Sequence, residues 1–487
     1  MSPLRSDSVK FFRLLALCLI PLAFRANTVQ GSSNPDTRPN LILILADDLG
    51  WADLGCYGNQ YNESPRIDQL AAMGMRWTQF YAGPVCSPTR ANIQSGQDQA
   101  RFGITQHIPG HRRPFAKLRD PEVPRQLPLE VTTFAELLGK AGYKTGYFGK
   151  WHLGGTGFGP KDQGWQTAVE TQGNTLSPAM AKVAGTDRMA EYLTNMAVDF
   201  IEQNRDQPFL LQVSHTAVHI PLSTTKSRRE KYQQKPAASN YPSRPDYAGL
   251  IEELDESVGR ILDTIERLQL SGRTLIIFTS DNGGLETEQN GTITTSNKPL
   301  RREKGTLYEG GIRVPMIACW QNKVQPGTKT DEIASTIDLF ATFADLAGCQ
   351  LPKTQPNDGI SLKGVLQDAS CSLPERALFW HLPHYHHSTP ASAIRMGGYK
   401  LLEFHEDHRL ELYDLNNDIG ESTNLSVTRT DMAARLHTAL QTWRHQVGAR
   451  MPEPNPDYDA ERSTELAKPN GGVQKKEKRR RPVKDGR

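Results

Sequence analysis

The chain reads LILILADDLG from Leu41 to Gly50, an aliphatic run that ends in two aspartates. A continuous aliphatic run of this length is typical of a parallel strand that is buried on both faces. The segment from Leu275 to Gly284 repeats the pattern and reads LIIFTSDNGG. Because ligands of open α/β sheets bind beyond the carboxyl ends of the strands, two acidic strand ends predict a polar site at one edge of such a sheet.

Strand and helix patterns alternate up to about residue 372. Further strands are predicted at Tyr143 to Phe148, Phe209 to Val213 and Val314 to Trp320. Helical periodicity marks Ile67 to Gly74, Phe134 to Gly142, Met189 to Gln203, Tyr247 to Leu268 and Ile337 to Ala347. This alternation predicts an α/β domain over residues 36–372, with a large, mainly parallel central sheet flanked by helices.

The pattern changes in the last quarter of the chain. Four short strand-like runs and then one helical segment predict a small antiparallel sheet with a packed helix over residues 373–450; they are Ala377 to Leu382, Ser392 to Met396, Tyr399 to Phe404, Leu410 to Leu415 and Met432 to Val447. Residues 451–487 are rich in Pro and Asn and end in a Lys/Arg run, which predicts an extended, mobile basic tail.

The first 31 residues have the pattern of a signal peptide. Basic residues precede the apolar run Leu14 to Phe24, and Val29 to Gly31 forms a cleavage site. The apolar run is too short to span a membrane, and we expect no span after signal removal. The chain is therefore predicted to be exported, to the periplasm or the medium, or to a lysosomal or extracellular location in a eukaryote.

The cysteine count argues against a disulfide-rich scaffold, and the charge distribution argues against a nucleic-acid-binding protein. Cys18 lies in the signal and Cys86 in a motif described below, so four cysteines remain, which is too few for a disulfide scaffold. Cys349 and Cys371 either form a bridge or, with Cys56 and Cys319, are buried thiols. The basic tail is either solvated or holds the protein near a polyanion, but no aromatic-interleaved basic patch points to nucleic acid.

The two acidic strand ends together form a candidate metal site. Asp47, Asp48 and Asp281 offer carboxylates, and Asn282 offers an amide oxygen. Each pair alone is an ordinary turn former. Jointly they are a set of hard oxygen ligands, which suits Ca²⁺ or Mg²⁺ and not a soft metal.

Other candidate residues lie in short motifs. Cys86 opens the run CSPTR, which we expect to be a loop of small residues, and an unpaired thiol is a liability in an exported protein. Lys150 and His152 end a predicted strand in the run GKWH, which suits an anion site beside a proton-transfer group. His219 follows the third strand and Lys304 lies in a cationic loop, and each alone is an ordinary structural or solvated residue.

These segments together resemble the type I sulfatases, the formylglycine-dependent members of the alkaline-phosphatase-like superfamily. The resemblance runs from about Pro39 to Pro454. It rests on five segments in family order: Asn40 to Leu54, Cys86 to Arg90, Gly142 to His152, Ser280 to Gly284 and Lys304 to Pro315. It implies an alkaline-phosphatase-like sandwich fold and sulfuric ester hydrolysis.

The resemblance also implies a role for each matching residue. Cys86 would be oxidised to formylglycine (3-oxoalanine) by a formylglycine-generating or anaerobic sulfatase-maturing enzyme. One Ca²⁺, with Mg²⁺ as the alternative, would be held by Asp47, Asp48, Asp281, Asn282 and the modified residue 86. Arg90 and Lys150 would fix the formylglycine hydrate, Lys150, His219 and Lys304 would bind the sulfate oxygens, and His152 would act as a base.

The chemistry explains why a modified residue is needed. A sulfate ester is a poor electrophile that is shielded by its own negative oxygens, so a dication and two lysines would offset its charge. An aldehyde hydrate has two hydroxyls, one to attack sulfur and one to expel sulfate after His152 removes its proton. A plain Ser or Cys nucleophile would stall as a covalent ester.

The chain departs from the family pattern after the cysteine motif. The family usually has two apolar residues and then Thr-Gly-Arg, whereas this chain has Gln94 in the apolar pair and Gln97 in place of the Arg. The Cys-Ser-Pro-Thr-Arg core is intact, so we expect Cys86 to be converted. Loss of the Arg is expected to alter the pocket rim.

The predicted substrate is a sulfated carbohydrate or an aryl sulfate. Candidate rim residues are His107, Arg112, Arg113 and the segment His381 to His387, in which His384, His386 and His387 are candidate contacts for a sulfated sugar. Two alternatives remain open: a phosphate or phosphonate ester hydrolase on the same scaffold, and a non-catalytic sulfoglycan-binding protein with an unconverted Cys86.

Overall fold

The computed structural model describes residues 38–239, 241–286, 288–289, 292–467 and 473–474. The predicted signal peptide, residues 1–31, and the Lys/Arg run of residues 475–487 lie outside the described residues. No helix within the described ranges is long and apolar enough to cross a membrane.

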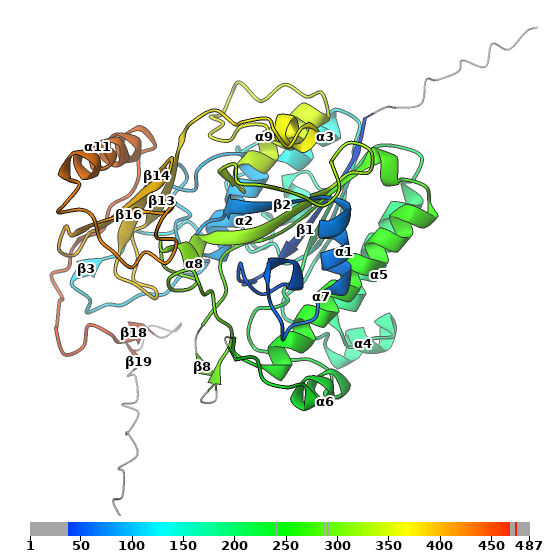
Figure 1. Cartoon of the computed structure of the whole chain (residues 1–487), viewed down its shortest axis with the longest axis horizontal. Coiled ribbons are helices and arrows are strands. Elements are labelled where there is room, and N and C mark those ends of the chain that lie inside the picture. The colour runs from blue at the N-terminus through cyan, green and yellow to red at the C-terminus, as the bar shows by residue number, and fades with distance from the viewer. Residues whose placement is uncertain (1–37, 240, 287, 290–291, 468–472, 475–487) are drawn as a thin grey trace, which may run out of the picture. The chain divides into compact units, whose positions relative to one another are not determined.

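A large sheet dominates the fold (Figure 1). Among the described residues its order is β11-β2-β10-β7-β1-β6-β4-β5, with β12 beside β2. β7, β1, β6, β4 and β5 run parallel, whereas β10 is antiparallel to both β7 and β2. The predicted α/β fold is therefore confirmed. The strands are β1 (Asn40–Ala46), β2 (Met75–Tyr81), β4 (Lys144–Gly149), β5 (Thr167–Glu170), β6 (Phe209–Ser214), β7 (Thr274–Ser280), β10 (Arg313–Cys319), β11 (Thr328–Thr330) and β12 (Ala334–Ser335).

Alternate residues of β1 face two separate cores. Leu41, Leu43 and Leu45 pack in the core that contains residues of α2, α3, α9 and α10, and Ile42 and Ile44 pack in the core that contains residues of α1, α5 and α7. The sheet thus lies between two helical layers, which is why β1 is aliphatic from Leu41 to Ala46. The helices are α1 (Pro65–Met73), α2 (Cys86–Ser95), α3 (Phe134–Lys140), α4 (Pro178–Ala184), α5 (Met189–Gln203), α6 (Lys226–Gln234), α7 (Pro245–Arg267), α8 (Glu309–Ile312), α9 (Asp338–Leu346), α10 (Lys363–Gln367) and α11 (Thr430–Gln446).

A second, four-stranded antiparallel sheet forms the C-terminal part, as predicted. Its order is β13 (Ala377–Leu382), β14 (Ala391–Met396), β15 (Tyr399–Phe404) and β16 (Leu410–Asp414). One face carries Leu401 and packs with Leu436 of α11. The other face carries Leu402 and packs with Tyr81 of β2 and Ile312 of α8. This sheet is therefore covered on both faces and is joined to the larger one by a shared core.

The chain beyond residue 450 is held against the protein where it is described. β17 (Glu453–Pro454) pairs with β3 (Leu118–Arg119), and the Asn455 side chain donates hydrogen bonds to the carbonyls of Pro114 and Ala116. The main-chain N–H of Ala467 donates to Arg112 O at 2.9 Å. These contacts correct the expectation of a mobile tail for residues 453–467. The remaining pairs are β18 (Leu466–Ala467) with β19 (Val473–Gln474) and β8 (Glu288–Gln289) with β9 (Thr292–Ile293).

All described cysteines are free thiols, so the bridge between Cys349 and Cys371 is not formed. Cys319 is buried, whereas Cys56, Cys349 and Cys371 are partly exposed, which also corrects the expectation of four buried thiols.

Candidate active site

The carboxyl ends of four neighbouring strands meet at one edge of the large sheet. Ala46 of β1 lies opposite Ser280 of β7, and Gly149 of β4 lies opposite Ser214 of β6. Gly149 has φ 121°, and a Cβ there would lie 1.9 Å from Ser214 O. Only glycine fits this close approach. The next residue, Lys150, then turns into the site, where its main-chain N–H donates to Ser214 O at 2.8 Å.

The predicted metal ligands form one buried cluster. The Asp48 N–H donates to Asp281 Oδ1 at 3.2 Å, and Asn282 Nδ2 donates to Asp48 Oδ1 at 2.9 Å. Asp48 has φ 63°, the left-handed conformation that is uncommon outside glycine and recurs at functional sites. Three oxygens in this cluster are buried without a hydrogen-bond partner among the described residues, namely Asp47 Oδ1, Asp48 Oδ2 and Asn282 Oδ1. Such oxygens are costly to bury, and they fit a hard cation.

Three cationic side chains neutralise the carboxylates. Arg90 donates to Asp281 Oδ2 from Nε at 3.0 Å and from Nη2 at 2.7 Å. Lys150 Nζ lies 2.5 Å from Asp47 Oδ2, and Lys304 Nζ lies 2.6 Å from Asp48 Oδ1. Each cation is therefore fixed in the site by a buried ion pair.

These charges act differently on the three aspartates. Burial alone raises the pKa of Asp47 and Asp48, but the neighbouring cations outweigh it and hold both values below the usual range; the main ones are Lys150 for Asp47 and Lys304 for Asp48. For Asp281, burial and then the Asp47 charge raise the pKa to about 7, although Arg90 opposes them. Three cations thus stand against the three carboxylates, so buried ammonium and guanidinium groups are available beside the open oxygens for an anionic substrate.

Cys86 is the first residue of α2, which corrects the expectation of a loop. Pro88 is tolerated there because the first turn of a helix needs no intrahelical N–H donor. The helical spacing of four residues places Cys86 and Arg90 on the same face. Cys86 Sγ lies 3.2 Å from His152 Nδ1 and is 2% exposed. The motif is thus a helical turn that presents residue 86 to His152.

The protonation state of His152 follows from its partners. Its Nε2 lies 2.5 Å from the Ile108 carbonyl oxygen, which can only accept, so Nε2 carries the proton. Nδ1 then has a free lone pair that faces residue 86. Burial first, and Lys150 next, lower the pKa of His152 to about 4. The ring is therefore neutral at physiological pH and is oriented to accept a proton from residue 86.

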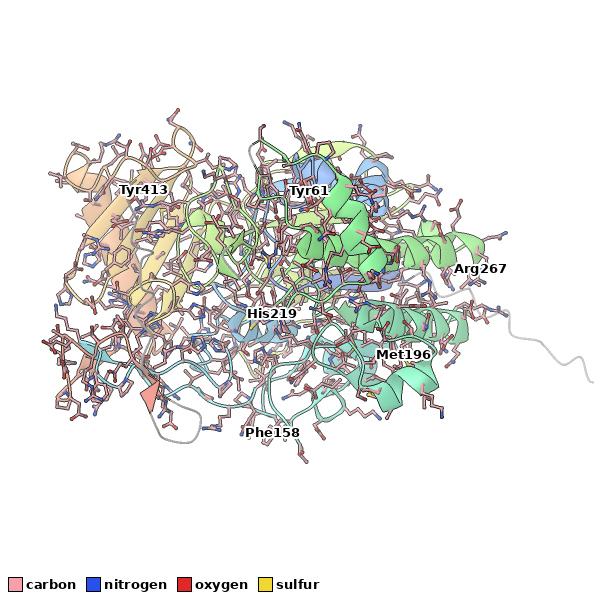
Figure 2. The ribbon with its side chains drawn as sticks, turned by 90° about the horizontal axis from the view of Figure 1, so that it is seen from below. Tyr61, Phe158, Met196, His219, Arg267 and Tyr413 are labelled. Atoms are coloured by element: carbon pink, nitrogen blue, oxygen red, sulfur yellow. The ribbon has the colours of Figure 1, made fainter. Side chains whose placement is uncertain are left out.

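His219 completes the group of predicted residues. It lies beyond the end of β6 and is labelled in Figure 2. Its Nδ1 lies 2.5 Å from the Ile220 carbonyl oxygen, and its Nε2 lies 3.6 Å from Asp48 Oδ2. The side chain is 28% exposed, in contrast to its buried neighbours. Direct contacts thus join Arg90, Lys150, His219 and Lys304 to the carboxylate cluster at this sheet edge, while Cys86 contacts His152.

Two further residues, Ser87 and Tyr147, support the site but were not predicted from the sequence. The Ser87 hydroxyl donates to His152 O at 2.9 Å and accepts from the Ile108 N–H at 3.1 Å. The Tyr147 hydroxyl donates to Lys150 O at 2.5 Å. Both fix the main chain next to a site residue. Ser87 lies inside the cysteine motif and Tyr147 inside the Gly142 to His152 segment. The two sequence segments therefore pointed to this part of the chain, but they did not predict these hydrogen bonds.

The predicted rim residues separate into two groups. His381 and His384 are at most 1% exposed, and their ring nitrogens bond Ser392, Arg450 O and Thr105. Both rings are held by the protein, but His384 also lines the cavity described next, so its contact with a sugar stays a prediction. His387 bonds Lys304 O at 2.7 Å through Nδ1, and so lies beside the site.

A large cavity lies next to this rim. It has a volume of about 960 Å³ and is lined by five arginines and four carboxylates: Arg112, Arg113, Arg119, Arg125, Arg450, Asp120, Glu122, Glu453 and Asp457. Its lining comes from the loop before and after β3 and from the segment beyond Arg450. The cavity does not include Cys86 or the carboxylate cluster in its lining.

The unusual Gln94 has its polar atoms paired. Its Nε2 donates to Gln212 Oε1 at 2.9 Å, and its Oε1 accepts from Trp165 Nε1 at 3.3 Å. Gln212 in turn donates to Ser214 Oγ at 2.9 Å. A polar residue therefore replaces an apolar one here without a buried unpaired group.

Comparisons with known proteins agree with this fold. A family model described as sulfatase matches residues 39–349, and one for the C-terminal region of N-sulphoglucosamine sulphohydrolase matches residues 302–446. A sulfatase of Formosa agariphila is 30% identical, over 90% of this chain and 94% of its own. Arylsulfatase A of Homo sapiens is 34% identical, over 80% of this chain and 83% of its own. The chain belongs to the sulfatase family, a class of sulfuric ester hydrolases.

A solved structure extends the match to three dimensions. Ps i-CgsB, crystallised in complex with k-i-k-neocarrahexaose, superposes with a TM-score of 0.73 at 26% identity. The alignment covers 86% of this chain and 94% of that chain.

Proposed function

We propose that this protein hydrolyses a sulfate ester of a carbohydrate to the alcohol and inorganic sulfate, with Cys86 converted to formylglycine and one Ca²⁺ bound beside it. The observation that carries the proposal is the set of three buried, unpartnered oxygens of Asp47, Asp48 and Asn282. They lie in the same cluster as two buried lysines and His152, which faces Cys86.

The residues present fit a bound dication. Asp47, Asp48, Asp281 and Asn282 would hold it together with residue 86, and all four side chains offer oxygen. Bound Ca²⁺ would supply positive charge against the negative charge that develops on the sulfate. Mg²⁺ is the alternative ion, although it demands a more regular octahedron of ligands.

The other side chains of the site would transfer protons and bind the sulfate group. His152 Nδ1 would take a proton from the residue at position 86. Lys150 and Lys304 would bind the sulfate oxygens, because both ammonium groups are buried and charged. For Lys304, burial opposes the charge, but Asp48 outweighs it and raises the pKa well above its ordinary value. Lys304 would donate the proton to the leaving alcohol, or His219 Nε2 would do so in the imidazolium form, because its Nδ1 proton is held by the Ile220 carbonyl.

Formylglycine fits position 86 because its hydrate would supply one hydroxyl to attack sulfur and another to release sulfate. Arg90, on the same helix as residue 86, donates hydrogen bonds to Asp281 and to the Lys150 carbonyl and so holds both in place. The family supports this proposal, as do the intact Cys-Ser-Pro-Thr-Arg run and the helical presentation of residue 86.

Two observations support a carbohydrate substrate. A relative is named N-acetylgalactosamine-6-sulfatase, and the solved structure of Ps i-CgsB holds an oligosaccharide. The large cavity next to the rim also offers arginine and carboxylate side chains that can hydrogen-bond a glycan. Export through the signal at residues 1–31 would bring the enzyme to such a substrate.

The first test is the chemical state of residue 86. In protein from a host with a maturation enzyme, the peptide that contains residue 86 should be about 18 Da lighter than its cysteine form, because a thiol is exchanged for an aldehyde. Cys86→Ala should keep the fold and lose turnover of an aryl sulfate, while Cys371→Ala, which changes a partly exposed thiol outside the site, should keep both. An unmodified Cys86 in fully active protein would overturn the proposal.

The second test is substrate class. Matched aryl sulfate and aryl phosphate should be turned over with a strong preference for sulfate, and a large phosphate preference would favour the phosphoesterase alternative. Sulfate release from a panel of sulfated oligosaccharides, measured by ion chromatography, would then identify the natural linkage.

A further inference from the structure

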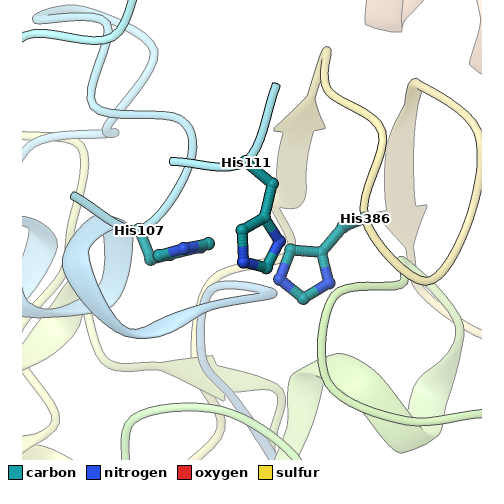
Figure 3. A group of neighbouring side chains, drawn as sticks. All are labelled: His107, His111 and His386. Atoms are coloured by element: carbon teal, nitrogen blue, oxygen red, sulfur yellow. The ribbon is translucent and has the colours of Figure 1, made fainter. Parts of the chain in front are cut away.

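Three histidines converge beside the candidate active site from segments far apart in the sequence. His107 and His111 belong to the loop between α2 and β3, and His386 belongs to the loop between β13 and β14. Figure 3 shows the three imidazole rings grouped together, with one nitrogen of His386 directed at His111. The ring centroids lie 4.5 Å apart for His107 and His111, 5.6 Å for His107 and His386, and 5.3 Å for His111 and His386.

The ring nitrogens of this histidine cluster are free to bind a ligand. One nitrogen from each ring lies within 4.8 Å of one nitrogen from each of the others. His107 Nδ1 is buried without a hydrogen-bond partner among the described residues. His386 is only 8% exposed, and the ring nitrogen that it directs at His111 is Nε2, because Nδ1 faces Gly305. Buried unpaired nitrogens carry a desolvation cost, which a ligand would remove.

The position of His386 is fixed by its neighbours. Gly305 has φ 75°, and a Cβ there would lie 1.9 Å from His386 Nδ1, so the ring packs directly on the glycine. Arg113 Nη2 donates to the His386 carbonyl at 3.0 Å. His386 is thus a rigid member of the cluster, whereas His111 is exposed and can rotate toward it.

The three rings are uncharged near neutral pH. Burial first, and then His111, lower the pKa of His107 to about 2. Burial first, and then His387, lower the pKa values of His111 and His386. Neutral imidazole is the form that coordinates metals, so no proton has to be displaced on binding.

We propose that His107, His111 and His386 form a second metal site, which takes a transition-metal dication such as Zn²⁺. Imidazole suits Zn²⁺, Cu²⁺ and Ni²⁺ and is a poor ligand for Ca²⁺, so the site differs in selectivity from the oxygen cluster. Three histidines with an open fourth position are a known arrangement for zinc. With Zn–N bonds of about 2.0–2.1 Å, tetrahedral nitrogens lie about 3.4 Å apart, so His111 must move inward by roughly 1 Å.

The charged groups that act on the histidine cluster are cationic. Lys304, Lys150 and Arg113 oppose a dication, so the neutral imidazole nitrogens, and not the local charge, would hold the metal. Because His111 also lines the arginine-rich cavity, a bound metal would tie the two rim loops together at the mouth of that cavity. Zn²⁺ is therefore expected to raise the melting temperature as well as to bind.

The test measures bound zinc directly and does not depend on turnover. Full-length, tag-free protein with saturating Ca²⁺ is dialysed against micromolar Zn²⁺, and the metal is counted by inductively coupled plasma mass spectrometry. Wild type should hold one equivalent of Zn²⁺. His111→Ala should lose it, and because His111 is exposed this variant should fold normally. His445→Ala, at an exposed histidine of α11, should retain it.

Other outcomes would overturn the proposed site. Absence of Zn²⁺ from the wild type would do so, as would one equivalent retained in both His111→Ala and His107→Ala, because the ion would then lie in the oxygen cluster or elsewhere. A raised KM for a sulfated oligosaccharide in His111→Ala, without zinc in the wild type, would instead make the cluster a substrate contact. A rise in melting temperature with Zn²⁺ that persists in His111→Ala would also contradict it.

Discussion

Gln94 illustrates how one buried polar residue is accommodated in a core helix. It is 1% exposed and makes two hydrogen bonds, to Gln212 and Trp165. Each of those partners is also buried, so neither can turn to water when Gln94 is changed.

Gln94→Leu is therefore expected to lower the free energy of unfolding by about 2 to 3 kcal/mol, because it leaves the Gln212 carbonyl and the Trp165 N–H unsatisfied. Urea denaturation measures the loss. Gln94→Leu combined with Gln212→Leu should recover part of it, since the orphaned Gln212 side-chain carbonyl is then removed at the cost of one hydrogen bond to Ser214 Oγ. A double variant that is less stable than the sum of the singles would contradict this account.

His152 predicts a pH dependence at the residue scale. Its pKa is lowered to about 4 by burial and Lys150, so the neutral, proton-accepting ring persists as the pH falls from 7 to 5 and is lost only near pH 4. For the converted enzyme, kcat/KM should show no decline from His152 above about pH 5. An acidic limb near pH 6.5 that disappears in His152→Gln would refute the prediction. His152→Gln should itself lower kcat by about 10²- to 10⁴-fold, as expected for loss of a general base.

At the scale of elements, a buried charge cluster joins β15 to α8. Lys400 Nζ lies 3.0 Å from Glu309 Oε1 and 2.9 Å from Glu421 Oε1, and all three residues are fully buried. Burial raises the pKa of Glu309, but Lys400 outweighs it and, with Arg313 and Arg395, lowers the value to about 2. The connection between the two sheets therefore depends on compensated charge as well as on apolar packing.

Lys400→Met should lower the free energy of unfolding by about 3 to 5 kcal/mol, because it leaves buried carboxylates without their partner. Lys226→Met is the matched control. The Lys226 side chain is 86% exposed in a surface pair with Glu230, and its loss should change stability by less than about 1 kcal/mol. Guanidinium denaturation gives the free energy of unfolding of both variants. Equal losses would show that the buried cluster stabilises the protein no more than a surface ion pair does.

At the scale of the whole molecule, the C-terminal segment is part of the rim. Residues 453–467 contact the loop of residues 112–119 through a strand pair and several side chains, including Arg462, whose guanidinium lies 3.4 Å from the ring centre of Phe115. The same two segments line the large cavity. The end of the chain thus shapes the region where we propose that a glycan binds.

Two truncations separate these roles. Removal of the chain after Ala467 should leave the turnover of a small aryl sulfate and the melting temperature unchanged. Removal after Arg450 should lower the melting temperature and expose residues 112–119 to proteolysis, because it deletes their hydrogen-bond partners. Equal behaviour of the two truncated proteins, by calorimetry and limited proteolysis, would show that the packed segment is dispensable.

Local sequence determined much of this protein by itself. The aliphatic runs of β1 and β7 specify strands that are buried on both faces. Because the carboxyl ends of parallel strands lie at the same edge of a sheet, the residues that follow them could be predicted to gather there: Asp47, Asp48, Asp281 and Asn282. A spacing of four residues likewise places Cys86 and Arg90 on the same face of one helix. In each case the determining contacts are between residues near in sequence, or between strands whose direction the pattern already indicates.

The tertiary structure decided what depends on contacts between distant segments. The Ile108 carbonyl selects the tautomer of His152, and no local pattern encodes that contact. The histidine cluster joins a loop near residue 110 to one near residue 386, and the Lys400 cluster joins β15 to α8. These groups meet only because the two sheets share a core, so the side chains that the sequence leaves as ordinary polar residues acquire their chemistry from burial and from neighbours supplied by the fold.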